Sequence, residues 1–258
     1  TGQETEAHLE VRRRALETLD LAAIVREQAQ YARDTLRARE PTTGRLATIV
    51  SGDALQSLLT GMFISPLVFR SAAQFKYQGL SPWEIGASIY GDAEVTGDPL
   101  TMYANAILPW GTRSAAFDRE GLPGRRLLVI EHGVLRQFWA SQRYAEYLNV
   151  PPTGEFGNLE LSPGSMAFAD MWEQDGILCH VVAFSSMTPD PVTGNFVAEI
   201  RLGYERRGSE LQPIKGGSLS GNLFTDLAGA RLSQETVFHG HYLGPEAIRF
   251  PALTVSGG

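Results

Sequence analysis

The first forty residues of the chain carry a helical pattern of apolar positions. From Leu21 to Ala38, apolar residues recur at three- and four-residue spacing, and Asp20 stands directly before them as a candidate N-cap. A proline and a glycine between Glu40 and Gly44 then end the pattern. We therefore expect one amphipathic helix over residues 21–38. Residues 8–12 alternate between polar and apolar types, which predicts a short strand ahead of the helix.

A second group of apolar runs follows the proline. Leu46–Val50 is apolar over the length of a strand and predicts a buried one. Ala54–Thr60 predicts a helix, with an extension as far as Phe63, and further helical character is expected over Leu67–Lys76.

The pattern changes from Trp83 onward. Short apolar runs now alternate with Gly, Pro, Asp and Asn at intervals of roughly ten residues, which is typical of antiparallel sheets. Helical segments are expected only at Tyr144–Leu148 and Ala167–Gln174. The predicted strands are Ile89–Tyr90, Met102–Ile107, Arg125–Glu131, Val134–Trp139, Ile177–Ala183, Asn195–Tyr204, Gln212–Ser218 and Ala252–Val255. This order predicts the α+β class, in which N-terminal helices precede a large, mainly antiparallel, curved or barrel-like β region.

Composition and charge narrow the class of protein. The chain has 258 residues, 43% of them hydrophobic and 20% charged, as expected for an ordinary globular protein. Its net charge of -7 argues against nucleic-acid binding, and we interpret Arg12–Arg14 as a solvated face. No apolar run approaches the roughly 18 residues of a membrane span, and the polar start is unlike a signal peptide. A single cysteine, Cys179, excludes an intrachain disulfide and fits a reducing cytoplasm. We therefore expect a cytoplasmic protein, and its charge and apolar runs predict that it binds neither nucleic acid nor membrane.

Two carboxylates lie close together in the middle of the chain. Asp118 and Glu120 would share a face on a strand and could then work as an acid–base or metal-binding pair. Gly121 and Pro123 follow at once, and they favour a capped turn instead. A little further on, Glu131–Gly133 predicts a hairpin turn with Gly133 at a positive φ and His132 exposed to solvent.

Two other places have residue types that take part in chemistry. Asp190–Phe196 is a loop in which Gly194 provides the left-handed position. Cys179 and His180 are neighbours on a predicted strand, so their side chains point to opposite faces and cannot bind one ion. We interpret Cys179 as a small buried hydrophobe.

The best metal candidates are His239 and His241. Two histidines at i and i+2 on a strand share a face and could reach one cation, but zinc needs further ligands and the sequence offers no obvious ones. The alternative is a pair of loop histidines in a glycine-containing turn. The residues by themselves thus indicate an α+β domain and no named activity.

A set of short motifs resembles the C-terminal domain of the TldD/PmbA (TldE) family. Phe117–Pro123 followed by Ile130–Leu135 resembles that family's "FDxEG" and "I-E-x-G-x-L" signature. Further pieces resemble family motifs in the same order, namely Gly97–Pro99, Ser141–Ala145, Asn158–Ser165, Thr193–Phe196, Pro213–Asn222 and Pro251–Gly258. In this context Asp118, Glu120, Gly121, Gly133, Gly194 and Gly221 are expected to be structural residues of the motifs.

The resemblance also implies a domain division. Residues 42–258 would form the C-terminal domain of the family, and residues 1–41 would be a remnant strand and a linking helix. The family's N-terminal domain is missing, so we expect either a fragment or a reduced family member.

The functional expectation depends on a departure from the family pattern. Catalytic members resembling this chain carry HExxxH on a helix, where two histidines hold zinc and the glutamate is the general base, and a cysteine near the C-terminus completes the site. The corresponding helix here, Ser51–Leu59, contains no histidine. The resemblance therefore implies the TldE/PmbA type, with no catalytic residue and no cofactor in this chain.

Such a chain would form a heterodimer with a TldD-like zinc subunit, which would hold the only zinc, and would help to enclose a cavity where peptides are cut. Two alternatives stay open. One is an independent metal-dependent hydrolase with a rearranged site at His239 and His241. The other is a homodimeric peptide-binding protein.

Overall fold

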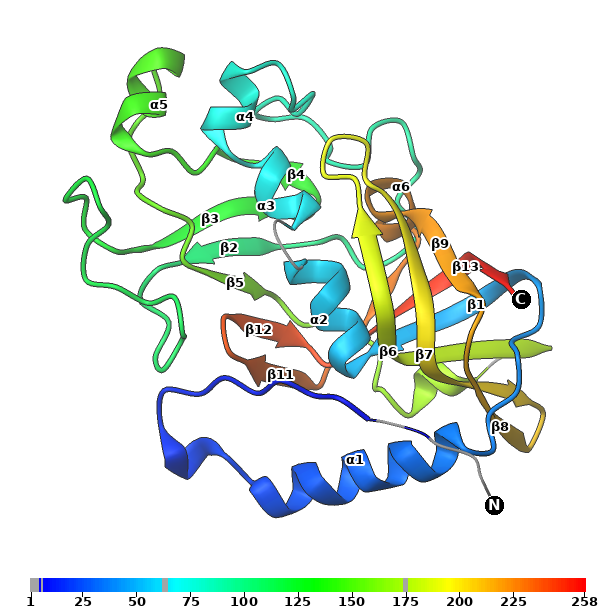
Figure 1. Cartoon of the computed structure of the whole chain (residues 1–258). Helices are drawn as coiled ribbons and strands as arrows, with labels where there is room; N and C mark the ends of the chain where they lie inside the picture. The colour runs from blue at the N-terminus through cyan, green and yellow to red at the C-terminus, as the bar shows by residue number, and fades with distance from the viewer. Residues whose placement is uncertain (1–4, 6, 62–64, 174–175) are drawn as a thin grey trace.

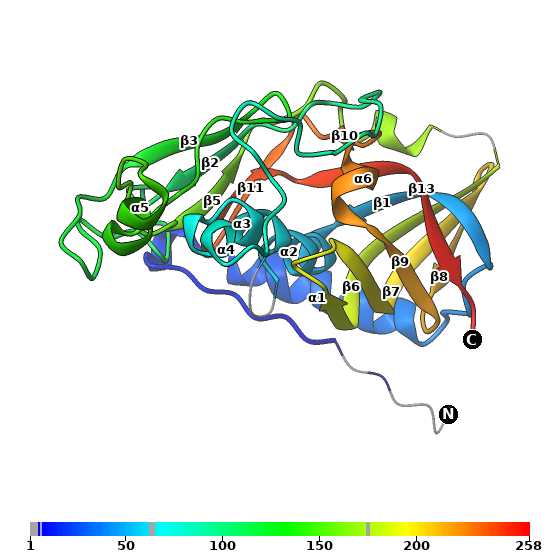
Figure 2. The ribbon, with the colours of Figure 1, turned by 90° about the horizontal axis from the view of Figure 1, so that it is seen from above.

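Two β-sheets and several short helices make up the structure (Figure 1), a computed structural model that describes residues 5, 7–61, 65–173 and 176–258. Figure 2 shows the two sheets side by side, with α2, α3 and α4 between and beside them. The helices are α1 (Leu21–Thr35), α2 (Gly52–Thr60), α3 (Pro66–Arg70), α4 (Ala73–Tyr77), α5 (Gln142–Leu148) and α6 (Leu223–Leu227). Within the described residues, no helix is both long and apolar enough to span a lipid bilayer.

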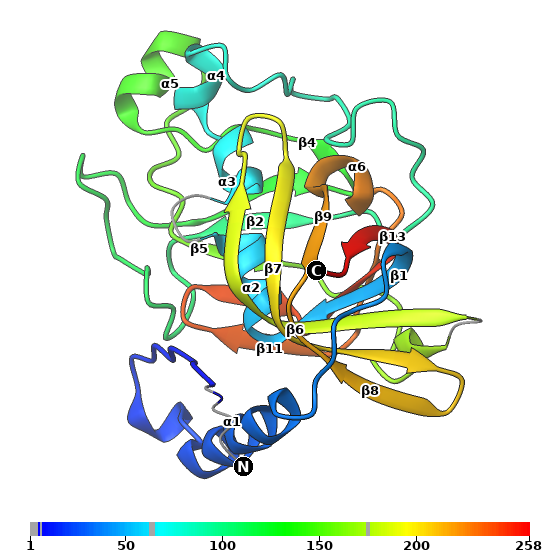
Figure 3. The ribbon, with the colours of Figure 1, turned by 45° about the vertical axis from the view of Figure 1, so that its right-hand side comes forward.

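The first sheet closes into a barrel. Its strands are β1 (Gly44–Ser51), β6 (Ile177–Pro189), β7 (Asn195–Arg207), β9 (Ser218–Asn222) and β13 (Ala247–Ser256), paired in that order. Because β13 also pairs with β1, the ring is complete (Figure 3). Only the β1–β6 pair in this ring is parallel. The α+β class with a barrel-like, mainly antiparallel β region is thereby confirmed.

Short strands extend the barrel and form the second sheet. β8 (Glu210–Ile214) pairs with β7, and β10 (Arg231–Leu232) pairs with β13. The second sheet runs in the order β11 (Thr236–His239), β12 (Tyr242–Pro245), β5 (Asn158–Leu161), β2 (Met102–Asn105), β3 (Arg126–Glu131) and β4 (Val134–Leu135). Its long β2–β3 and β4–β5 connections are the segments that form the candidate site described below.

One hydrophobic core joins the two sheets. It includes Leu58 of α2, Phe250 of β13 and Met102 of β2, all of which are buried. Burying such large apolar side chains is the main favourable term in folding. Since α2 contributes four buried apolar residues to this core, its position relative to both sheets is well determined.

Several predicted elements are confirmed, with shifted ends. Asp20 is the N-cap of α1, since its side chain accepts a hydrogen bond from Ala23 N at 2.9 Å, but the helix ends at Thr35 instead of Ala38. The helical region expected over residues 67–76 consists of two short helices, α3 and α4. β6 and β7 are longer than predicted because each pairs with the other along its length, from Ile177↔Arg207 to Pro189↔Phe196.

Other predicted elements are wrong. Residues 8–12 form no strand, and Ile89–Tyr90 lies in turns next to an isolated bridge. Alternating polarity produces a strand only where a neighbour supplies hydrogen bonds, and residues 8–12 pair with no strand. The predicted strand over residues 212–218 is two strands, because Gly216 and Gly217 adopt positive φ and interrupt it, and β9 then continues along β7 in the same direction as β8.

The remaining differences concern short elements. β4 ends at Leu135 instead of Trp139, and only Asp170–Trp172 forms a 3-10 turn within the expected 167–174 helix. The expected extension of α2 to Phe63 lies outside the described residues, and so does Gln174, the expected end of the helix over residues 167–174. The pattern did not predict α6, β10, β11 or β12, which are two to five residues long.

Candidate functional site

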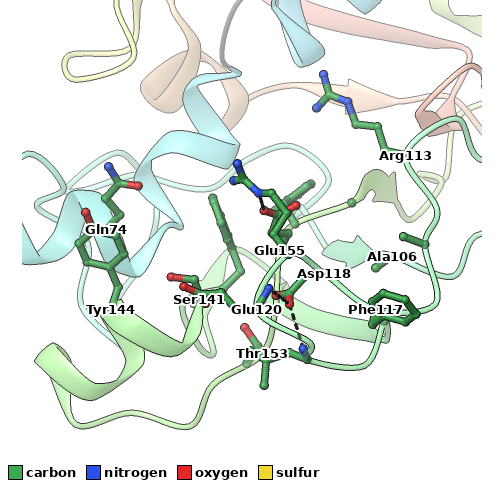
Figure 4. Close-up of a pocket in the computed structure, with 18 of the residues that line it drawn as sticks. Gln74, Ala106, Arg113, Phe117, Asp118, Glu120, Ser141, Tyr144, Thr153 and Glu155 are labelled. Atoms are coloured by element: carbon green, nitrogen blue, oxygen red, sulfur yellow. Dashed lines mark hydrogen bonds and ion pairs between the residues drawn. The ribbon is translucent and has the colours of Figure 1, made fainter.

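A cleft with a volume of about 1180 Å³ lies beside the second sheet. Three segments form it, namely α3 with α4, the β2–β3 connection and the β4–β5 connection that contains α5. Figure 4 shows Gln74 and Tyr144 on one side of it, Phe117 on the other, and Asp118 and Glu120 between them. The predicted motif at residues 117–123 is therefore part of the wall of this cleft.

Aromatic side chains make a firm apolar wall. Phe69 and Phe75 stack with their ring centroids 3.6 Å apart, and Trp139 meets Phe156 edge-on at 5.8 Å. Trp139 Nε1 donates a hydrogen bond to Val68 O at 2.9 Å, which fixes the indole against α3. Aromatic pairs of this kind hold their relative orientation, so the wall can receive apolar side chains without rearranging.

Asp118 organises the turn on the opposite wall. Its Oδ1 accepts hydrogen bonds from the backbone N–H groups of Glu120 and Leu122, each at 2.9 Å. Gly121 sits at φ 81°, and its N–H donates to Asp118 O. This is the arrangement of a capped turn. Asp118 Oδ2, by contrast, is buried and has no hydrogen-bond partner among the described residues. A ligand in the cleft with an N–H group would satisfy it.

Glu120 acts separately from Asp118. Its Oε2 accepts a hydrogen bond from Gln142 N, the first residue of α5, at 2.6 Å. Next to it, Arg119 Nε and Glu155 Oε1 form an exposed ion pair at 2.6 Å. These contacts tie the β2–β3 connection to the β4–β5 connection. Because the carboxylates of Asp118 and Glu120 hold different backbone groups, the arrangement is not that of an acid–base pair.

His239 and His241 occupy a hairpin turn. His239 is the last residue of β11, and Gly240 with His241 forms the two-residue turn before β12. They therefore do not follow one another along a single strand, and the shared face expected from i, i+2 spacing does not apply. Arg13 Nη2 lies 3.5 Å from His239 Nδ1.

Positive charge surrounds these two histidines. Burial and the charge of Arg13 lower the pKa of His239 to about 4, and burial with the charges of Arg113 and Arg12 lowers the pKa of His241 to about 4. Within the described residues, no three or more His, Cys, Asp or Glu side chains gather in a way that could hold a metal ion. The local charge favours anions over cations.

Cys179 and His180 point away from each other. Cys179 is fully buried in the main core, and burial raises the pKa of its thiol. His180 Nε2 lies 2.7 Å from Ser51 Oγ, and its ring packs edge-on against Trp172. Burial lowers the pKa of His180 to about 3. Ser51 and His180 are 7% and 6% exposed, so this Ser–His pair cannot reach a substrate and has a packing role.

The motif glycines are required by close contacts. Gly133 has φ 76° in the β3–β4 turn, and a Cβ there would lie 2.4 Å from Tyr90 Cε2. Gly194 has φ 84°, and its Cβ would lie 2.2 Å from the Phe224 ring. At Gly221 a Cβ would lie 2.5 Å from Asp226 Oδ2. His132, between β3 and β4, is exposed.

Pattern reasoning missed the cleft itself. Phe69 and Trp139 each lie in an apolar run that predicts only burial, Phe156 stands alone between Glu155 and Gly157, and the three are far apart in the sequence. The sequence signal that could have found the cleft is the pair of long connections, since loops carry binding sites more often than strands do.

The sequence matches one protein-family model and two curated proteins. The family model for the PmbA/TldA metallopeptidase C-terminal domain matches residues 43–257. The chain is 29% identical over 126 residues to a zinc metalloprotease TldD homolog of Saccharolobus solfataricus, a match that covers 43% of this chain and 28% of that protein. An uncharacterised protein of Methanocaldococcus jannaschii is 23% identical over 171 residues, covering 60% of this chain and 39% of its own length.

Two solved structures share the fold. TldE from Thermococcus kodakarensis superposes with a TM-score of 0.78 at 20% identity, covering 95% of this chain and 57% of that one. A putative modulator of a DNA gyrase from Thermotoga maritima gives a TM-score of 0.79 at 21% identity, covering 94% and 57%. At these identities the likeness shows the fold alone. The chain spans well under two thirds of the length of each of these relatives.

Proposed function

The chain belongs to the PmbA/TldD metallopeptidase family through that family's C-terminal domain, and from this premise we propose that it is a cytoplasmic, zinc-less subunit of a TldD/TldE-like peptidase complex. It acts in proteolysis or peptide maturation together with a TldD-like subunit that holds the zinc. The chain itself carries no catalytic residue and no cofactor, and its substrate is a peptide.

The composition of α2 carries this proposal. In the catalytic family members the corresponding helix bears HExxxH, whereas α2 reads GDALQSLLT and has neither histidine nor cysteine. Its Leu55, Leu58 and Leu59 are no more than 1% exposed and belong to the main core. A helix whose inward positions are all leucine or alanine stabilises the fold but offers no ligand to zinc.

The other metal-ligating residue types support the same conclusion. His239 and His241 lie at the β11–β12 turn near Arg12, Arg13 and Arg113, which is unfavourable for a divalent cation. Cys179 is fully buried in the core.

The cleft supports a role in binding the peptide substrate. Its aromatic wall can receive apolar side chains, and Asp118 Oδ2 is an acceptor without a partner among the described residues, in a side chain that lines the cleft. An extended peptide presents apolar side chains and N–H groups along its length. A non-catalytic subunit that holds an unfolded peptide next to a partner's zinc would therefore need a surface of this kind.

Co-purification and a peptidase assay test the proposal. The chain is mixed with a TldD-like subunit carrying HExxxH, encoded in the same genome, and complex formation and cleavage of an unstructured peptide are measured. We expect a stable complex whose activity needs both chains and is abolished by changing the partner's motif. If the chains do not associate, and cleavage does not depend on this chain, the proposal is wrong.

Metal analysis of the purified chain distinguishes the zinc-less subunit from an independent metal-dependent hydrolase. Stoichiometric zinc that is lost in both His239→Ala and His241→Ala would replace the proposal by a rearranged metal site. A homodimeric peptide-binding protein would instead bind peptide as a stable dimer of this chain and leave the activity of any zinc subunit unchanged.

A further inference from the structure

A small cavity of about 80 Å³ adjoins the cleft. Segments far apart in the sequence meet there, since Thr60 ends α2, Ser65 precedes α3, Arg113 lies in the β2–β3 connection and His241 lies in the β11–β12 turn. Arg113 is one of several residues that line both the cavity and the cleft. Figure 4 shows Arg113 extending away from the Asp118 turn.

Polar groups without partners gather around this cavity. Ser65 is 3% exposed, and its Oγ has no hydrogen-bond partner among the described residues. The same holds for His241 Nε2, which is also buried. The Arg113 guanidinium forms no hydrogen bond or ion pair that the described part of the chain shows. More than nine in ten buried polar groups in proteins are satisfied by protein, water or ligand, so these two beside an arginine make the cavity a candidate binding site.

The charge around the cavity selects the sign of that ligand. No residue that lines it is acidic, and Arg12 lies close enough to affect both Arg113 and His241. Guanidinium binds planar oxyanions with two parallel N–H donors, and a hydroxyl and an imidazole N–H add donors of ordinary strength. The set Arg113, Ser65 and His241 therefore presents donors to an anion of a few atoms.

We propose that this cavity binds a carboxylate, donated to by Arg113, Ser65 Oγ and His241 Nε2, and that it is the C-terminal carboxylate of a peptide lying in the cleft. The volume fits, because liquid water takes about 30 Å³ per molecule and a carboxylate has only three heavy atoms. Phe156 and Gly157 line both spaces, so a peptide chain can pass from one to the other. The peptide as occupant rests on the proposed function; the carboxylate site itself does not.

Binding of one peptide in two forms tests the idea. A short, unstructured, N-terminally fluorescein-labelled peptide is titrated with the full chain, either with a free C-terminal carboxylate or as the C-terminal amide, and fluorescence anisotropy is recorded. We expect the acid to bind roughly tenfold more tightly than the amide, since a charge-assisted pair is lost in the amide. Arg113→Ala should remove this preference. Arg143→Ala, at an exposed arginine that also lines the cleft, should retain it.

Ser65→Ala separates binding from folding. It removes a buried hydroxyl that has no partner in the described structure, so the melting temperature should stay the same or rise while the preference for the acid falls. A drop in melting temperature with unchanged binding would contradict the proposal.

Sodium acetate as a competitor distinguishes a site for the C-terminal carboxylate of a peptide from a site for a small free carboxylate. Acetate that displaces the acid peptide, and that no longer binds to Arg113→Ala, supports a C-terminal carboxylate at this site. If acetate binds to the protein but the acid and amide peptides bind with equal affinity, the site does not take the C-terminal carboxylate of a peptide. Equal peptide affinities and no acetate binding would overturn the site, whatever the co-purification with a zinc subunit shows.

Discussion

Glu120 Oε2 accepts a hydrogen bond from the backbone N–H of Gln142 across 2.6 Å, and so joins the turn at residues 117–123 to the first residue of α5. The two residues lie in different connections of the second sheet. A carboxylate at a helix N-terminus also interacts favourably with the helix dipole. The relative position of the two walls of the cleft therefore depends on this contact.

Replacing Glu120 should destabilise this region. In Glu120→Ala the N–H of Gln142 at the start of α5 loses its acceptor, and loss of such a cap costs typically about 1 kcal/mol. Urea unfolding followed by circular dichroism measures the change. Glu94→Ala, at an exposed glutamate, is the control and should change the free energy of unfolding by less than about 0.5 kcal/mol. Equal effects of the two variants would show that the contact is unimportant.

Asp118→Asn should separate the two oxygens of this side chain. An asparagine Oδ1 can still accept from Glu120 N and Leu122 N, so the turn and the melting temperature should be retained. Its Nδ2 donates where Oδ2 would accept, so affinity for the labelled peptide should fall several-fold. Asp118→Ala, by contrast, should lower stability by about 1–3 kcal/mol because it removes both turn hydrogen bonds. Unchanged peptide affinity in Asp118→Asn would show that Asp118 Oδ2 does not contact the peptide.

Phe117→Ala should affect binding without affecting folding. Phe117 lines the cleft and is 68% exposed, so the free energy of unfolding should stay within about 0.5 kcal/mol of the parent. Peptide affinity, and cleavage by the complex, should both fall. Parallel anisotropy and thermal-unfolding measurements check this, and a loss of stability without a loss of affinity would contradict it.

Gly194→Ala should be strongly destabilising. The new Cβ would lie 2.2 Å from the Phe224 ring, and φ is 84° at this position. Strain and overpacking together should cost about 2–4 kcal/mol. Gly208→Ala has a similar positive φ of 59° with nothing within 4 Å, so it should cost only about 1 kcal/mol. Thermal unfolding of the pair isolates the contact with Phe224, and equal losses would show that only the backbone conformation matters.

His180 should make stability depend on pH. Burial lowers the pKa of its folded form to about 3 from an ordinary value of 6.5, so between these values the unfolded chain binds more protons. The stability from His180 is complete above pH 6.5 and decreases as the pH falls toward 3, at up to about 1.4 kcal/mol per pH unit. His239 and His241, with pKa values lowered to about 4, act in the same direction.

Urea unfolding at pH 7.5 and pH 5 measures this effect, and His180→Leu should reduce the difference between the two. A titration of the His180 ring protons by NMR that shows a midpoint near 6.5 in the folded protein would contradict the assignment.

Elements with a strong local signal were predictable. Asp20 caps α1 as expected, because an N-cap works through its own neighbours, and the β3–β4 turn follows from Gly133 in the same way. The ends of elements were less predictable. β6 and β7 continue for 13 residues each because they pair with one another, and residues 8–12 form no strand because they pair with no described strand.

Sequence by itself determined the class of the fold, the family, the turn-forming glycines and the absence of histidine in α2, since each depends on residue identity or on spacing along the chain. Only the tertiary structure decided that the Asp118 turn lines a cleft, that His239 and His241 lie near arginines, and that Ser65, Arg113 and His241 line one cavity. These residues are brought together by closure of the barrel and by packing of the second sheet against α2. Such contacts join distant segments, and no local periodicity records them.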